Sequence, residues 1–133
     1  MFLNHGIYGK VRILSRPSVI AMTRNKIPGI GSVYAQGKEV FREASYGFGW
    51  SVVHDLGNCL VYSEPLQSLK SFSHGGFGGV FLWIDPTYEI VGAYFSVFSL
   101  KGLPEGRSLL ERYYLKGRMD YYINAVTAAV TDV

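Results

Sequence analysis

The stretch Ser73-His-Gly-Gly-Phe-Gly-Gly-Val-Phe-Leu-Trp-Ile-Asp-Pro86 decides how this sequence folds. Four glycines fall among five consecutive residues, and an apolar, aromatic run follows that ends at an Asp-Pro turn signal. Aromatic and β-branched residues favour strands, so we predict one long strand over residues 72–84. Glycines weaken a strand unless another group approaches its backbone closely. That group is either a substrate, with a backbone N–H donating to a developing oxyanion, or the chain itself in a β-bulge or close sheet-to-helix packing.

The segments on both sides of this stretch predict further strands. Residues 89–98 are rich in Val, Ile, Tyr and Phe, and the short Asp-Pro-Thr turn joins them to the preceding strand as an antiparallel hairpin. Upstream, Tyr46-Gly-Phe-Gly-Trp-Ser-Val-Val-His is a strand candidate, and Leu60-Val-Tyr is a shorter one. These segments together predict one antiparallel sheet.

Helices are expected before and after the strands in the sequence. Ser15 is a plausible N-cap and Pro17 suits a first turn, which predicts a helix through Met22. A loop over residues 24–37 follows, because Pro and Gly interrupt any period there. Shorter helical segments are expected at residues 1–4, stopped by Gly6, and at 108–115. From Arg118 onward, apolar residues recur at spacings of three and four, as in an amphipathic helix: Met119, Tyr122, Ile123, Val126, Ala129 and Val130. The predicted class is α+β, an antiparallel sheet with helices packed on one face.

Composition limits the classes of protein to consider. A chain of 133 residues has room for a single domain over residues 1–133, and its 48% hydrophobic content suits a packed core. The net charge of +3 comes without a basic stripe, which argues against nucleic-acid binding. Cys59 is the only cysteine, so no internal disulfide is possible. Neither a signal peptide nor a membrane-spanning run is visible, so we expect a cytoplasmic protein by default.

The glycine-rich stretch resembles the third motif of the serine β-lactamase and penicillin-binding-protein superfamily. There Lys-Thr-Gly is often replaced by His-Gly-Gly in the esterase-like branch near the class C β-lactamases. Three flanking segments are similar to family members in the same order. They are Arg12-Ile-Leu-Ser-Arg-Pro-Ser-Val-Ile-Ala-Met-Thr, Tyr46-Gly-Phe-Gly-Trp-Ser-Val and Asn124-Ala-Val-Thr-Ala-Ala-Val. The resemblance implies the C-terminal part of a β-lactamase/transpeptidase-like fold, and a hydrolase that cleaves esters or amides through an acyl-serine without a cofactor.

The resemblance also implies roles for particular residues. His74 takes the place of the family's Lys, where it would line the site and hydrogen-bond the substrate or the second-motif residue. Gly75 and Gly76 take the places of Thr and Gly. The backbone N–H of Phe77 would be one of two oxyanion-hole donors, and the nucleophile would provide the other.

The nucleophile itself is absent from this sequence. No Ser is followed three residues later by Lys, and no Gly-x-Ser-x-Gly elbow is present. Tyr122-Ile-Asn124 fits the form of the second motif, but it follows the third motif, whereas the family order is the reverse. We therefore expect no catalytic residue in this chain and no activity from it alone.

The remaining polar residues favour structural interpretations. The three histidines lack metal-ligand spacing, so no metal site is expected. Ordinary strand-end, surface or core positions are the preferred interpretation of the other candidates: His54-Asp55, Glu39, Glu43 and Cys59.

A partial fold of this kind should leave a strand edge and an apolar face uncovered. Two kinds of partner would cover them. One is a complementary N-terminal fragment carrying Ser-x-x-Lys, and only such a complex would act on a small ester or amide. The other is a second copy of the chain, in a non-catalytic, self-associating module with no substrate. A relic that folds by repacking is the third outcome left open.

Overall fold

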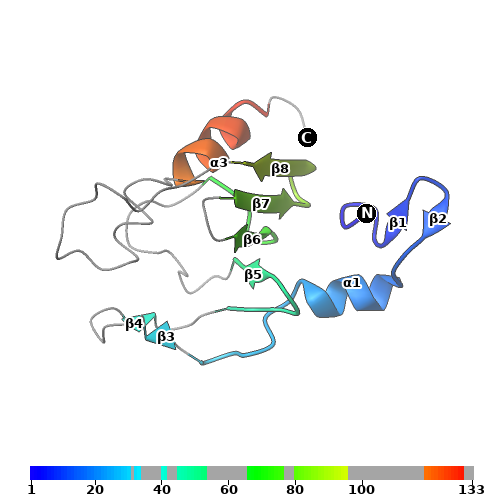
Figure 1. Ribbon diagram of the computed structural model, residues 1–133, viewed down its shortest axis with the longest axis horizontal. Coiled ribbons are helices and arrows are strands. Elements are labelled where there is room, and N and C mark those ends of the chain that lie inside the picture. Colours follow the sequence, from blue (N-terminus) through cyan, green and yellow to red (C-terminus); the bar gives the residue numbers. More distant parts are fainter. Residues whose placement is uncertain are drawn as a thin grey trace.

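The computed structural model describes residues 1–30, 32–33, 40–41, 45–53, 66–76, 80–95 and 119–130 (Figure 1). Its main feature is a four-stranded antiparallel sheet with the order β5-β6-β7-β8. The strands of this sheet are β5 (Ser51–Val52), β6 (Phe72–Gly76), β7 (Val80–Asp85) and β8 (Ile90–Tyr94). The other elements are β1 (Ile7–Tyr8), β2 (Val11–Arg12), α1 (Arg16–Met22), β3 (Ser32–Val33), β4 (Val40–Phe41) and α3 (Met119–Ala128).

Strand β7 is an inner strand of the sheet and pairs with β6 and β8. It pairs with β8 from Phe81↔Tyr94 to Asp85↔Ile90, which confirms the hairpin predicted at Asp-Pro-Thr. It pairs with β6 from Phe72↔Ile84 to Gly76↔Val80. The prediction of one strand over residues 72–84 is therefore wrong, because the chain reverses between Gly76 and Val80. Closely spaced glycines, which accept turn conformations without steric cost, are the sequence feature that permits this reversal.

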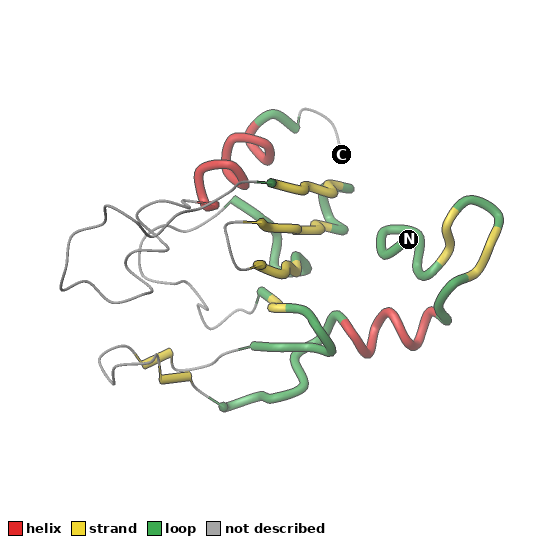
Figure 2. The backbone as a smooth tube through the Cα atoms, viewed as in Figure 1, coloured by secondary structure: helices red, strands yellow, loops and turns green. Residues whose placement is uncertain are grey.

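The predicted strand over residues 46–54 is also mostly wrong. Only Ser51–Val52 pairs with β6, and the preceding residues form a loop that leads into β5 (Figure 2). Tyr46 forms an isolated bridge with Ser51, and Gly47 N–H donates to the Trp50 carbonyl at 2.8 Å, so residues 46–51 are a tight reversal. Gly49 has φ +82°, a left-handed conformation that glycine adopts without strain.

Two other differences concern the N-terminal half. The segment expected as a loop over residues 24–37 contains β3, which pairs antiparallel with β4. Residues 1–6 form hydrogen-bonded turns rather than the end of a helix, although Gly6 does adopt a positive φ of 96°. The elements expected at residues 60–62 and 108–115 lie outside the described residues.

The two faces of the sheet carry separate clusters. Because side chains alternate along β7, Leu82 and Ile84 point to one face, whereas Phe81 and Trp83 point to the other. The first face packs Trp50, Val52, Phe72 and Ile84 with Phe2, Leu3, Met22 and Leu82. The second packs Trp83, Ile90 and Ile123 with Phe81, Tyr88 and Val130. An antiparallel sheet packed against helical segments confirms the predicted α+β class.

Both helices expected around the sheet are present. Ser15 caps α1, since its Oγ accepts from Ser18 N–H at 3.1 Å, and Pro17 lies in the first turn as expected. In α3, Ile123 is buried against the sheet, whereas Tyr122 and Val126 of the predicted apolar stripe are 44% and 41% exposed. Figure 1 shows α3 beside the β8 end of the sheet, while β1, β2 and α1 reach away on the other side. Within the residues that the structure describes, no helix is long and apolar enough to cross a membrane.

Candidate functional site around His74

His74 lies in the middle of β6, opposite Leu82 of β7. Alternation along the strand places it on the same face as Phe72, and its side chain is exposed there. The strand is regular through this region, since each residue from Phe72 to Gly76 has one partner in β7. The β-bulge interpretation of the glycines is therefore excluded for β6.

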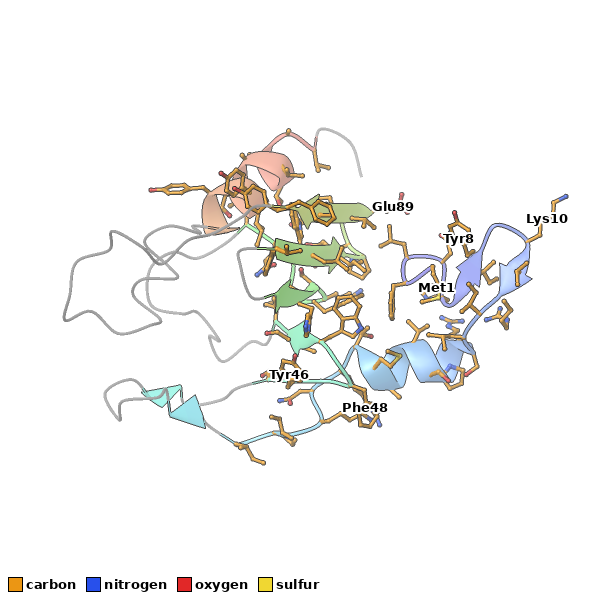
Figure 3. The ribbon with its side chains drawn as sticks, viewed as in Figure 1. Met1, Tyr8, Lys10, Tyr46, Phe48 and Glu89 are labelled. Carbon is orange, nitrogen blue, oxygen red and sulfur yellow. The ribbon has the colours of Figure 1, made fainter. Side chains whose placement is uncertain are left out.

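The imidazole of His74 is held by the loop that precedes β5. Its Nδ1 lies 2.9 Å from the carbonyl oxygen of Gly49 and 3.3 Å from the hydroxyl of Tyr46. Both partners belong to residues 46–50, Tyr-Gly-Phe-Gly-Trp, which we call the 46–50 turn. Tyr46 lies beside β5, and Phe48 projects further out on the same loop (Figure 3).

Glycines make the shape of the 46–50 turn possible. A Cβ at Gly47 would overlap the carbonyl of Met22, against which the turn is packed. Two backbone hydrogen bonds fix this contact: Phe48 N–H donates to Met22 O at 3.1 Å, and Lys26 N–H donates to Tyr46 O at 2.8 Å. The turn is therefore anchored to the chain that leaves α1, and the position of the Gly49 carbonyl follows from that anchoring.

An aromatic cluster of Phe2, Trp50 and Phe72 packs against the end of the 46–50 turn. The Trp50 ring lies 5.1 Å from Phe72 and 5.0 Å from Phe2 between centroids, in edge-to-face geometry. Trp50 and Phe72 are both buried. Edge-to-face aromatic pairs stabilise beyond their buried area by about 0.5–1.5 kcal/mol each. The end of the turn and the start of β6 therefore share one rigid core, which holds His74 and its partners in register.

Strand β6 extends further than its neighbour β5. Strand β5 pairs only with the first two residues of β6, Phe72 and Ser73, so no described strand continues beside Gly75. A Cβ at Gly76 would lie 3.4 Å from Cβ of Val80, at the short end of ordinary contact, so packing within β6–β7 does not require glycine there. Phe77, the expected oxyanion donor, lies outside the described residues.

The remaining candidates are not gathered around His74. Asn124 accepts a hydrogen bond from Leu66 N–H at 2.6 Å, and its helix packs on the face opposite His74. His5 is exposed and lies in the N-terminal turns. Across the described ranges, no three His, Cys, Asp or Glu residues could hold a metal ion. The remaining polar candidates of the sequence lie outside those ranges: Glu39, Glu43, His54, Asp55 and Cys59.

Sequence reasoning missed the partners of His74. The sequence pattern predicts a strand over Tyr46 and Gly49, in which a backbone carbonyl would pair with a neighbouring strand. The available signal was the pattern Tyr-Gly-x-Gly-Trp, because two glycines separated by one residue are more typical of a tight turn than of a strand.

Comparison with known proteins supports the fold. No protein-family model matches the sequence, and no curated protein matches it. A crystal structure of a β-lactamase from Mycobacterium bovis is similar to this structure, with a TM-score of 0.60 and 18% sequence identity. The match covers 86% of this chain and 38% of that chain. This chain therefore has a β-lactamase-like fold, and it spans little more than a third of the β-lactamase that it matches.

Proposed function

We propose that this chain is the C-terminal part of a serine hydrolase related to the class C β-lactamases and penicillin-binding proteins, in the esterase-like branch. The complete enzyme would cleave an ester or amide through an acyl-serine. This chain would contribute the substrate-binding strand, and the nucleophile would come from the part of the fold that this chain does not contain.

One observation carries this proposal. The chain matches a β-lactamase over 86% of its own length but only 38% of the other chain, and its His-Gly-Gly lies on a regular strand at an exposed site. The family resemblance requires such a strand for the third motif. Its oxyanion donor would be Phe77 N–H, with Gly75 and Gly76 leaving room for the substrate.

Chemistry in the isolated chain would be negligible. An oxyanion donor without a nucleophile and a general base supplies little catalysis, because there is no acyl-enzyme to form. The edge of β8 is a suitable place for the missing part, since β8 pairs only with β7 among the described strands. Val91 and Phe95, on and just beyond this strand, are 58% and 78% exposed.

The test is active-site labelling of the natural protein. The chain is purified from its source through a C-terminal tag, under conditions that preserve complexes, and treated with a fluorophosphonate. We expect label on a serine within a Ser-x-x-Lys sequence outside these 133 residues, on the same natural polypeptide or on a bound one, and slower labelling in a His74→Ala variant. If no serine is labelled, or if His74→Ala labels at the parental rate, the proposal is wrong.

A second candidate function is non-catalytic self-association. Two groups of exposed apolar side chains favour it. Val91 and Phe95 lie on and just beyond β8, and Tyr121, Tyr122 and Val126 lie on α3, which packs on the sheet face opposite to Val91. A stable dimer needs an interface of at least about 1,000 Å². Sedimentation equilibrium of the pure chain would show a dimer that Val91→Lys converts to monomer, whereas a monomer at all concentrations would exclude this candidate.

A further inference from the structure

The hydrogen bond between His74 and Gly49 determines which ring nitrogen carries the proton. A carbonyl oxygen can only accept, so at 2.9 Å from Gly49 O the Nδ1 atom must be the donor. In a neutral imidazole one nitrogen is a donor and the other an acceptor. Nε2 of His74 is then unprotonated.

The second partner of Nδ1 agrees with this assignment. The Tyr46 hydroxyl lies 3.3 Å from Nδ1, a longer contact than that to Gly49 O. A hydroxyl oxygen can accept as well as donate, so it shares the Nδ1 proton and turns its own proton elsewhere. Neither partner contacts Nε2, and no described residue hydrogen-bonds that atom.

We propose that the 46–50 turn fixes His74 in the Nδ1–H tautomer, so that Nε2 accepts a hydrogen bond from a hydroxyl or N–H group of the ligand. A lysine at this position would present an ammonium group with three donors and a positive charge. A neutral histidine in this tautomer presents a lone pair instead. The site therefore selects a proton donor and disfavours an ionised carboxylate, which has only acceptors.

The rigidity of the 46–50 turn maintains the Nδ1–H tautomer of His74. The Gly49 carbonyl cannot follow a rotated imidazole, because the turn is hydrogen-bonded to Met22 and Lys26 and packed on Phe72 through Trp50. One hydrogen bond of ordinary strength corresponds to a preference of roughly five- to tenfold between tautomers. The tautomer is a property of this chain alone, whereas the ligand class rests on the proposed function.

The test is NMR spectroscopy of the isolated chain labelled with ¹⁵N-histidine, at mildly alkaline pH where imidazoles are neutral. The ¹⁵N shifts distinguish protonated from unprotonated ring nitrogens, and His74→Gln assigns the signals. We expect His74 to be predominantly Nδ1–H, while His5, whose side chain is exposed, shows the mixture of a free histidine. A His74 spectrum that matches the His5 spectrum, or one with the proton on Nε2, overturns the proposal.

Two variants separate the roles of the partners. Tyr46→Phe removes the longer contact and should leave the tautomer unchanged. Gly49→Ala disfavours the φ of +82° and should shift His74 toward Nε2–H by about the same five- to tenfold. An unchanged tautomer in folded Gly49→Ala would show that the Gly49 carbonyl does not set it; if that variant does not fold, the parental spectrum still decides.

A pair of small probes tests the ligand class. Acetamide and acetate have nearly the same shape, but only acetamide has N–H donors. We expect the Nε2 signal of His74 to shift on titration with acetamide and not with acetate, and the preference to be lost in His74→Lys, observed through the Gly75 amide. A response to acetate alone, or to neither probe, would refute the assignment of Nε2 as the acceptor.

Discussion

Asp85 is a buried side chain whose loss should disturb the sheet that carries His74. It is 1% exposed at the end of β7, and its carboxylate accepts hydrogen bonds from two separate segments. Oδ2 accepts from Ser68 N–H at 2.6 Å, and Oδ1 accepts from Ser68 Oγ at 2.6 Å. Oδ1 also accepts from Thr87 N–H at 2.9 Å and Tyr88 N–H at 3.4 Å. Asp85 therefore ties the entry to β6 to the turn between β7 and β8.

The size of the effect follows from these four bonds. In Asp85→Asn the amide oxygen can keep the three Oδ1 donors, but its NH₂ group then faces Ser68 N–H, so one bond is lost. A hydrogen bond to a charged group contributes about 1.5–3 kcal/mol, and the other three weaken without the charge. We expect Asp85→Asn to lower the free energy of unfolding by about 3 kcal/mol. Ser68→Ala alone should cost about 1.5–3 kcal/mol, and less once Asp85 is already Asn, because the two residues share a bond.

Urea unfolding followed by tryptophan fluorescence is a suitable assay, since both tryptophans, Trp50 and Trp83, are buried. Glu89→Gln is the matched control, because Glu89 is an exposed carboxylate in the same turn region and should change stability by less than about 0.5 kcal/mol. An Asp85→Asn variant as stable as this control would refute the argument that the carboxylate joins the two segments.

Three further outcomes can be measured independently. Gly92→Ala should destabilise by about 1–3 kcal/mol in urea unfolding, because a Cβ there overlaps the Trp83 ring, and wild-type stability would show that the ring can move aside. Ser15→Ala should cost about 1 kcal/mol through loss of the α1 cap, and no change would mean that water replaces it. The hydrogen bond with Tyr94, and then the repulsion between the two oxygens, raises the pKa of Tyr122, so Tyr94→Phe should lower that pKa in a tyrosinate absorbance titration. Because the pKa is raised on folding, the contribution of this pair is present below about pH 10 and lost as the pH rises through the folded pKa.

The parts of the fold that could be predicted are those set by local chemistry. The Ser15 cap with Pro17 in the first turn fixes the start of α1, and Asp-Pro-Thr between two apolar runs fixes the β7–β8 hairpin. The periodicity after Arg118 locates α3, which begins one residue later. Each of these signals lies within a few residues of the element it predicts.

The wrong strand predictions fall on glycine-containing segments, because glycine is compatible with both a strand and a turn. The patterns of residues 72–84 and 46–54 predict strands, but the chain reverses within both segments. The periodicity predicts the helix α3 correctly but not the burial of its apolar positions. Among the described side chains of α3 only Ile123 is buried, because burial depends on what covers the helix.

In the candidate site, too, the local structure could be predicted and the tertiary contacts could not. The likeness to a third motif placed His74 on a strand with two glycines after it, as the structure has it. Its hydrogen-bond partners come from residues 25 and 28 positions earlier, Gly49 and Tyr46. Their approach depends on the tertiary contact with Met22, which no local pattern encodes.

The strand that carries His74 and the outer strand β8 are different parts of the sheet, separated by β7. The face around Trp50 and Phe72 holds His74 on β6. Val91 pairs with Ile84 and therefore points to this same face, two strands away on β8, whereas α3 packs on the opposite face. We expect a completing polypeptide or a second copy to bind along the outer edge of β8, which is separated by β7 from the strand of His74. Val91→Lys should then abolish association and leave the His74 tautomer unchanged, and Gly49→Ala should do the reverse. If one substitution altered both properties, the two regions would be coupled through β7, and the site would depend on the partner for its geometry as well as for its nucleophile.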